Sequence, residues 1–230
     1  MEVSRTFHGL FWHVLVLAMV FVGAIAHGQD PTAYDVSYLS CWQGRDQTDF
    51  GSRQQRTAIL VSHTGAKAFG TVVATASSTG SCQNTTTLFA SDGKTEPENV
   101  YRVSREGTQD GNGIRLVAWS PSGRKLLAEI TTWAYGSDAG LGKLLLVYDT
   151  VTKHASELTV FPQLIAALGE KCDLQVSAMR WISDGEVLVS AKRQLPESDT
   201  EATSLDCPPT QHFFRLDVST DQLKPYHRAR

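Results

Sequence analysis

A short polar turn ending in glycine recurs three times along the chain and sets its architecture. The three glycines are Gly65, Gly123 and Gly185, which lie 58 and 62 residues apart. Each turn separates two apolar runs, and its Ser, Pro, Asp and Gly residues are those that tight turns favour. Two apolar runs joined by such a turn indicate a β-hairpin. A hairpin repeated at this nearly constant period indicates one structural unit that occurs three times.

Each hairpin continues into two further apolar runs, so that four strands follow one another as a meander. We therefore predict an all-β chain of three antiparallel four-stranded repeats, spanning residues 58–104, 113–160 and 174–226. Pro162 and Gly169 bracket an apolar stretch and predict one short helix near 162–168.

The segment ahead of the repeats, residues 27–57, is polar and irregular. Tyr34 to Leu39 alternates weakly between apolar and polar residues and predicts one strand. Arg45 to Arg56 is charged and rich in Gln without a clear period, and so predicts a loop.

The middle repeat carries a family resemblance. Its turn reads Trp119-Ser-Pro-Ser-Gly123-Arg-Lys-Leu-Leu-Ala, and its third strand ends Leu-Val-Tyr-Asp149. This pattern resembles the blade of TolB-type and WD-repeat-like β-propellers, over one blade well and over the other repeats more loosely. The resemblance implies blade-like sheets with Trp119 and Trp181 packed between them. Because propellers close with four to eight blades, three copies imply a partial or open propeller. The family resemblance carries little information on function.

The N-terminus has the pattern of a secretory signal peptide. Arg5 supplies a positive charge, Val14 to Ala26 is an uninterrupted run of 13 residues of low polarity, and Ala24-Ile25-Ala26 is a small-x-small cleavage pattern. An uncleaved membrane anchor is the alternative, but the run is shorter than the roughly 20 residues that a membrane span needs. We therefore expect export, with residues 1–26 removed.

Four cysteines remain after such cleavage, and an even number in an exported chain predicts disulfides. Spacing alone allows three pairings, so the repeats must decide. Cys41 and Cys172 each precede a first strand, while Cys82 and Cys207 each precede a third strand, and these two positions lie at the same end of a meander. We therefore predict Cys41–Cys82 and Cys172–Cys207, each local to one copy. Asn84-Thr85-Thr86 is a glycosylation acceptor if the source is eukaryotic.

Composition and motifs favour a binding protein over an enzyme. The formal net charge of −3 favours neither nucleic acid nor a strongly cationic partner. The sequence contains no Gly-x-Ser-x-Gly elbow, and the glycines from Gly136 to Gly142 lack the spacing of a phosphate loop. No two histidines stand at the close spacing of metal ligands. We therefore predict no catalytic residues, no metal site and no cofactor.

The predicted binding face is the end of the stack that carries the connections between second and third strands. These insertions are Ala76 to Gln83, Trp133 to Gly142 and Arg193 to Pro209. Loops on a rigid scaffold are where binding residues concentrate. The middle insertion offers Trp133, Tyr135 and Asp138, an aromatic anchor beside a charge, for a macromolecular partner or ligand. Packing of both aromatics beneath neighbouring loops is the alternative.

Two other functions stay open. One is a secreted or periplasmic hydrolase or lyase that uses residues of the long-loop face. The other is a structural subunit that completes a ring by association, because unpaired sheet faces and edges at the two ends of an open arc would favour weak self-association.

The first testable prediction concerns processing. If the leader is cleaved after Ala26, the exported chain starts at His27, and its intact mass lacks the first 26 residues. Mass spectrometry of the protein recovered from the periplasm or medium measures this directly. Retention of the whole N-terminus in the membrane fraction would show an uncleaved anchor instead.

Overall fold

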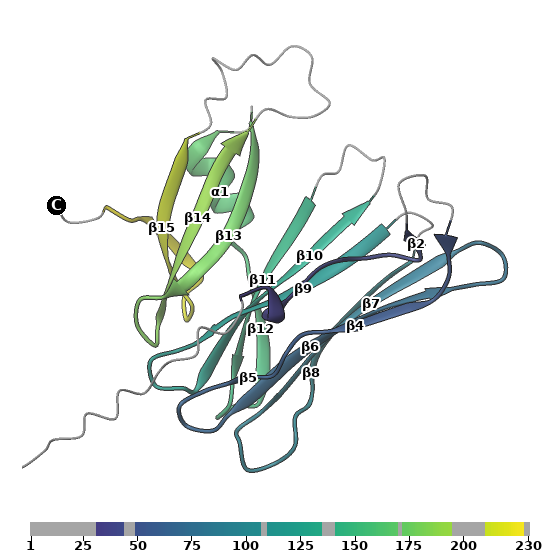
Figure 1. The fold of residues 1–230 in the computed structure, drawn as a ribbon. Coiled ribbons are helices and arrows are strands. Elements are labelled where there is room, and N and C mark those ends of the chain that lie inside the picture. The colour runs from purple at the N-terminus through teal and green to yellow at the C-terminus, as the bar shows by residue number, and fades with distance from the viewer. Residues whose placement is uncertain are drawn as a thin grey trace, which may run out of the picture.

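A computed structural model describes residues 31–43, 49–106, 110–134, 141–169, 172–194 and 210–227. The fold is all-β, with three antiparallel sheets of four or five strands, none of them closed into a barrel (Figure 1). A propeller is thus neither confirmed nor contradicted, while the all-β prediction with three sheets is confirmed. The predicted leader lies outside the described residues, as do Tyr135, Asp138 and Cys207.

Each repeat forms one sheet. The first sheet contains β4 (Arg53–Arg56), β5 (Leu60–Val61), β6 (Lys67–Ala76), β7 (Cys82–Ser91) and β8 (Glu98–Glu106). The second has the order β1 (Asp35–Leu39), β9 (Asp110–Trp119), β10 (Lys125–Ala134), β11 (Leu141–Asp149) and β12 (His154–Leu158). The third has the order β13 (Asp173–Trp181), β14 (Glu186–Gln194), β15 (Gln211–Asp217) and β16 (Gln222–Pro225).

The N-terminal segment is more regular than predicted. Tyr34 to Leu39 does contain a strand, β1, which follows the 3-10 helix η1 (Pro31–Tyr34). Arg45 to Arg56 was predicted as a loop, but it contains β4 and β3 (Asp49–Phe50), the latter paired with β2 (Trp42–Gln43). Strand β4 is polar throughout and exposed along most of its length, so it lacks the apolar alternation that identifies a strand. It forms because its backbone pairs with the edge of β6.

Strand β1 joins the second sheet, although the first repeat lies between them in the sequence. It pairs antiparallel with β9, with Asp35 opposite Arg115 and Val36 opposite Ile114. The segment 27–57 therefore contributes an edge strand to each of the first two sheets, which have five strands instead of the predicted four.

The predicted helix is confirmed as α1 (Phe161–Leu168), between the second and third sheets in the chain. Pro162 lies in its first turn, and Gly169 ends it with a φ of 90° while its N–H donates to the carbonyl of Ile165. This conformation is one that glycine adopts without strain. Within the described ranges, no helix has the length and apolar character needed to cross a membrane.

The second sheet is the middle layer of the stack and is buried on both faces. In β10, Leu126, Ala128 and Ile130 pack in a core shared with the first sheet. Leu127, which lies between them, packs in a second core shared with the third sheet and α1. The alternation of a strand sends successive side chains to opposite faces, so a strand covered on both sides is apolar at successive positions. This explains the uninterrupted apolar runs of the middle repeat.

One tryptophan contact recurs at both joints between sheets. The indole N–H of Trp119 donates to the carbonyl of Leu60 in the first sheet, at 3.1 Å. The indole N–H of Trp181 donates to the carbonyl of Ala118 in the second sheet, at 3.0 Å. Leu60 and Ala118 hold the same repeat position, one residue before Val61 and Trp119 respectively. The prediction that the two tryptophans pack between the sheets is thus confirmed.

A backbone irregularity also recurs at one repeat position. Pairing of β9 with β10 shifts by one residue at Val117, and pairing of β13 with β14 shifts at Met179, two residues before each tryptophan. In the first sheet the same position falls in the gap between β4 and β5. A bulge bends a strand and increases its twist, so the repeat conserves a local shape that the apolar pattern does not reveal.

The Cys41–Cys82 disulfide is confirmed, but its predicted placement within one copy is wrong. Cys41 follows β1 of the second sheet, whereas Cys82 begins β7 of the first sheet. The bridge is buried and joins two sheets. Cys172 is also disulfide-bonded; its predicted partner, Cys207, lies outside the described residues.

The joint between the first and second sheets depends on the absence of a side chain at Gly70. A Cβ atom placed there would lie 2.6 Å from Cγ2 and 2.8 Å from Cδ1 of Ile114. We predict that Gly70→Ala lowers the free energy of unfolding by about 1–3 kcal/mol through overpacking. Denaturant unfolding would measure the loss. Gly51→Ala is the matched control, because no atom lies within 4 Å of its added Cβ.

A double-mutant cycle makes this prediction specific. In an Ile114→Ala background the clash disappears, and Gly70→Ala should then cost little. An equal cost in both backgrounds would place the effect elsewhere than at this contact.

Candidate functional site

The turns at Gly65, Gly123 and Gly185, which join the first and second strands of the three sheets, lie at one end of the stack. The hydroxyl of Thr64 donates to the carbonyl of Gly123 at 3.3 Å, and the N–H of Ser122 donates to the carboxylate of Asp184 at 2.8 Å. This second bond lowers the pKa of Asp184. We call this the turn end. Strands β6, β10 and β14 all start there and end at the opposite end, which we call the loop end (Figure 1).

The predicted binding residues are described only in part. Trp133 lies near the loop end of β10, where its backbone is paired with Leu141 on one side and Gly111 on the other. Tyr135 and Asp138 lie outside the described residues. The three residues therefore remain a prediction.

The first of the three predicted insertions is shorter than expected. Ala76 to Gln83 was predicted as a long connection, but β6 and β7 extend into it and leave residues 77–81 as a tight turn. The side chain of Ser77 holds this turn through the hydroxyls of Thr79 and Ser81, at 2.8 and 2.6 Å. Only the middle and third repeats keep long connections at the loop end.

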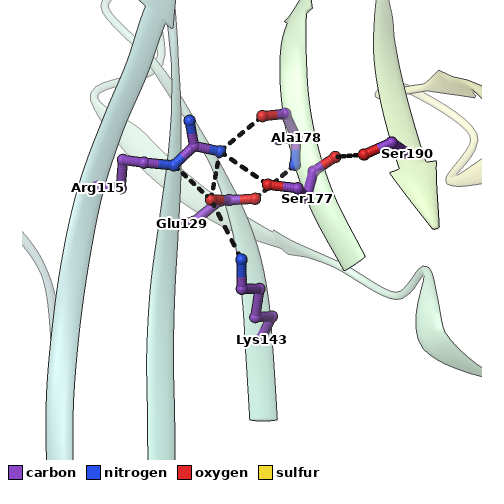
Figure 2. Close-up of polar contacts among 6 residues, drawn as sticks. All are labelled: Arg115, Glu129, Lys143, Ser177, Ala178 and Ser190. Carbon is purple, nitrogen blue, oxygen red and sulfur yellow. Dashed lines mark hydrogen bonds and ion pairs between the residues drawn. The ribbon is translucent and has the colours of Figure 1, made fainter. Parts of the chain in front are cut away.

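A charged cluster that the sequence did not predict lies between the second and third sheets (Figure 2). Glu129 projects from β10, and its side chain is only 2% exposed. Its carboxylate accepts hydrogen bonds from Arg115 of β9, with Nε at 2.7 Å. The ammonium of Lys143, from β11, lies 3.9 Å from the same oxygen.

The same cluster reaches across to the third sheet. The second carboxylate oxygen of Glu129 accepts the backbone N–H of Ala178 in β13. Arg115 donates to the carbonyl of Ala178 at 2.7 Å and to the hydroxyl of Ser177 at 3.2 Å. One ion pair thus bonds both the N–H and the carbonyl of Ala178, immediately before the bulge at Met179. Figure 2 shows Arg115 and Glu129 bonded to β13, with Lys143 bonded to Glu129.

The position of Glu129 recurs in each repeat with a different residue. Gly70, Glu129 and Ser190 hold equivalent positions on the second strands of the three sheets, because they lie opposite Thr57, Arg115 and Ser177 respectively. At the first joint the glycine leaves room for Ile114, and an apolar contact results. At the second joint the same position carries a charge that binds the next sheet. A single charged residue inside the apolar run Leu126 to Ile130 is the sequence signal that indicates this contact.

The cluster continues onto β1 through Asp35, which lies opposite Arg115. Partial burial raises the pKa of the Asp35 carboxyl, while the charge of Arg115 opposes that effect. Asp35, Arg115, Glu129 and Lys143 thus alternate in sign across four strands. The oxygens of Glu129 already accept bonds from Arg115 and Ala178, so the arrangement suits a structural clip better than a general base.

Other polar residues give no support for catalysis. In the part of the chain that the structure describes, no group of three or more His, Cys, Asp or Glu side chains could hold a metal ion. His63 lies in the first turn, His154 and His212 belong to different sheets, and His227 follows the last strand. The hydroxyl of Tyr101 donates to Glu157 at 2.6 Å, which ties the first sheet to the second; burial, together with this bond, raises the pKa of Tyr101.

The glycosylation acceptor at Asn84 is incompatible with the folded chain. Asn84 is fully buried between the first and second sheets, and its side-chain amide lies 3.7 Å from the sulfur of Cys82. A glycan needs an exposed attachment point. The Asn-Thr-Thr pattern is therefore part of a strand: Asn84 and Thr86 face the joint between the sheets, and Thr85 faces the other side of β7.

Comparison with known proteins gives the chain no family: no family model matches it, and no curated protein or solved structure does.

The charged clip gives the third prediction. Glu129→Ala leaves the buried N–H of Ala178 without its acceptor and removes one of the acceptors of Arg115, whose side chain is 32% exposed. We expect it to lower the free energy of unfolding by about 1–3 kcal/mol, the range for leaving a buried donor unsatisfied. Glu186→Ala is the control, because its pair with Arg215 is partly exposed and 3.9 Å long. Exposed pairs contribute about 0–1 kcal/mol. Equal losses from the two variants would contradict the assignment of the clip.

Proposed function

We propose that the protein is an exported, non-enzymatic binding module of the β-propeller-like class, with its binding face at the loop end. The observation that carries the proposal is the shared direction of β6, β10 and β14, which all end at the loop end. The opposite end consists of short turns bonded to one another. A rigid scaffold that presents loops on one side is the usual arrangement of a binding surface.

Two described contacts support rigidity beneath that face. The Cys41–Cys82 bridge lies next to the 77–81 turn and joins the first two sheets. The clip of Glu129 and Arg115 joins the second and third. Preorganised loops lose less conformational freedom when a partner binds, so this support favours affinity. The buried disulfide also supports export, since disulfides persist in oxidising compartments.

The proposed contact residues are Trp133, Tyr135 and Asp138, for a protein, another macromolecule or a ligand. An aromatic pair beside a carboxylate is the composition of interface hot spots. The strand that leads to them, β10, is the most enclosed of the second sheet, with apolar packing on both faces. A partner that binds at this loop would therefore contact residues whose supporting strand is held rigidly by packing on both faces.

A second candidate, weak self-association through the end sheets, has its own support. Val61 on the first sheet is 55% exposed, and Met179 on the third is 45% exposed. Their repeat equivalents in the middle sheet, Trp119 and Val117, are half-buried against neighbouring sheets. The end sheets thus present apolar positions that a further sheet would cover.

Charged side chains also lie on both outer faces. The outer face of the first sheet carries Arg56, which lies over the ring of Phe69 at 3.7 Å. The outer face of the third sheet carries Arg180 and Arg215, both opposite Leu188. Arg215 pairs with Glu186 at 3.9 Å, so this face carries both signs of charge.

The fourth prediction tests the loop-end face. Trp133→Ala should abolish capture of the partner while leaving the thermal midpoint nearly unchanged, because an interface anchor contributes to binding and little to folding. Pull-down from the native exported fraction, followed by calorimetry of the purified variant, gives both readouts. Phe161→Ala is a matched control, since Phe161 is an aromatic residue with 39% exposure outside the loop-end connections.

Two results would overturn this assignment. A large fall in the thermal midpoint of Trp133→Ala would show that Trp133 packs beneath its neighbouring loops. Unchanged capture by Trp133→Ala would remove it from the binding face.

A further inference from the structure

A pair of buried polar side chains lies in the joint between the first and second sheets. Asn112 of β9 is fully buried, and neither its amide nitrogen nor its amide oxygen has a hydrogen-bond partner among the described residues. Thr86 of β7 is also fully buried, and its hydroxyl oxygen has none within the same ranges. A buried polar group without a partner is costly, and the great majority in native proteins bond to protein or to ordered water.

The strand registers, together with one contact between the sheets, indicate that these two side chains lie in the same part of the joint. Ile114 packs against Gly70, which fixes how β9 lies on β6. Two residues closer to the loop end, Asn112 follows on β9 and Val72 follows on β6. Thr86 is the partner of Val72 on the neighbouring strand, so Asn112 and Thr86 project into the same part of the joint.

The surroundings of this part of the joint are closed and polar. Thr132 lies opposite Asn112 on β10, and Leu39 lies opposite it on β1. Asn84, two residues from Thr86 and on the same face, contacts the sulfur of Cys82. The Cys41–Cys82 bridge thus lies on the loop-end side, while the contact of Ile114 with Gly70 lies on the turn-end side.

We propose that Asn112 and Thr86 bind an internal water molecule in this joint. The side chain of Asn112 requires both a donor and an acceptor, and the hydroxyl of Thr86 can serve as either. A metal cation would satisfy the amide oxygen of Asn112 but repel its amide hydrogens, and an anion would do the reverse. Water supplies both roles, and a buried water typically makes about three hydrogen bonds.

Enclosure gives this water a distinctive property. Asn112 and Thr86 are fully buried between the disulfide and the Ile114 contact, so we expect exchange with solvent to require the first two sheets to separate locally. The water should therefore reside far longer than surface water, and reduction of Cys41–Cys82 should shorten its residence.

Two measurements test the site on the intact chain. A crystal structure at high resolution should show a density peak within hydrogen-bonding distance of both Asn112 and Thr86. Oxygen-17 magnetic relaxation dispersion should count at least one long-lived water, and Asn112→Leu should remove one from that count. Asn99→Leu, at an exposed position of β8, should leave the count unchanged.

A second variant protects the test against misfolding. Thr86→Val keeps the shape of the side chain and removes only its hydroxyl, so it should shorten the residence of the water even if Asn112→Leu fails to fold. Thr95→Val, at an exposed position, is its control. Rubidium-soaked crystals that give an anomalous peak at this position would show a cation instead and overturn the proposal. A dry joint, with no density peak and no change in the water count of either variant, would overturn it as well.

Discussion

The indole-to-carbonyl hydrogen bond between sheets is the contact on which the stack depends. A buried indole N–H must find an acceptor, and here the acceptor is a carbonyl of the preceding sheet, once for Trp119 and once for Trp181. The bond fixes both the distance between two sheets and the register of their first strands. At each joint a bulge lies two residues before the tryptophan that donates the bond, so the same local backbone shape presents both indole rings. A repeat that keeps these two features keeps its stacking geometry, even where other residues differ.

The two joints use one geometry with different chemistry. At the first, Gly70 brings two strands close together, and Ile114 fills the space that a side chain would occupy. At the second, Glu129 takes the equivalent position and bonds the backbone of Ala178 together with Arg115. A charge pair in such a position adds little net stability compared with a well-packed apolar contact, but the loss of one partner leaves the other groups unsatisfied. The first joint is therefore sensitive to side-chain volume, and the second to the loss of a hydrogen-bonding partner.

The sequence revealed those parts of the fold that depend on local pattern. The turns at Gly65, Gly123 and Gly185, the long strands beside them and the helix over 162–168 all follow from residue preferences within short windows. The pairing Cys41–Cys82 was also predicted correctly, although the prediction assumed that both cysteines belong to one repeat. The pairing of β1 with β9 contradicts that assumption. The contacts that the sequence did not reveal join residues that are distant along the chain. Nothing in Arg53 to Arg56 or in Asp35 to Leu39 tells which sheet edge will accept it, because edge pairing is made by the backbone. The clip of Arg115 and Glu129 and the burial of Asn84 and Asn112 likewise depend on which faces meet. Of the aromatic residues proposed for binding, Trp133 lies near the end of β10 and Tyr135 follows that strand; their role in binding stays a prediction.

The position of β1 has a consequence for the order in which the chain can fold. It is synthesised before the first repeat, yet its partner β9 belongs to the second, so an entire sheet must be made in between. Contacts between residues distant in sequence form slowly, because a long loop has to close first. The first repeat can complete its hairpins early, but Cys41 reaches its place beside Cys82 only once β9 has captured β1. The Cys41–Cys82 disulfide would then form late in folding and stabilise the assembled sheets. Until β9 is available, β1 would present an unpaired edge that a chaperone could shield.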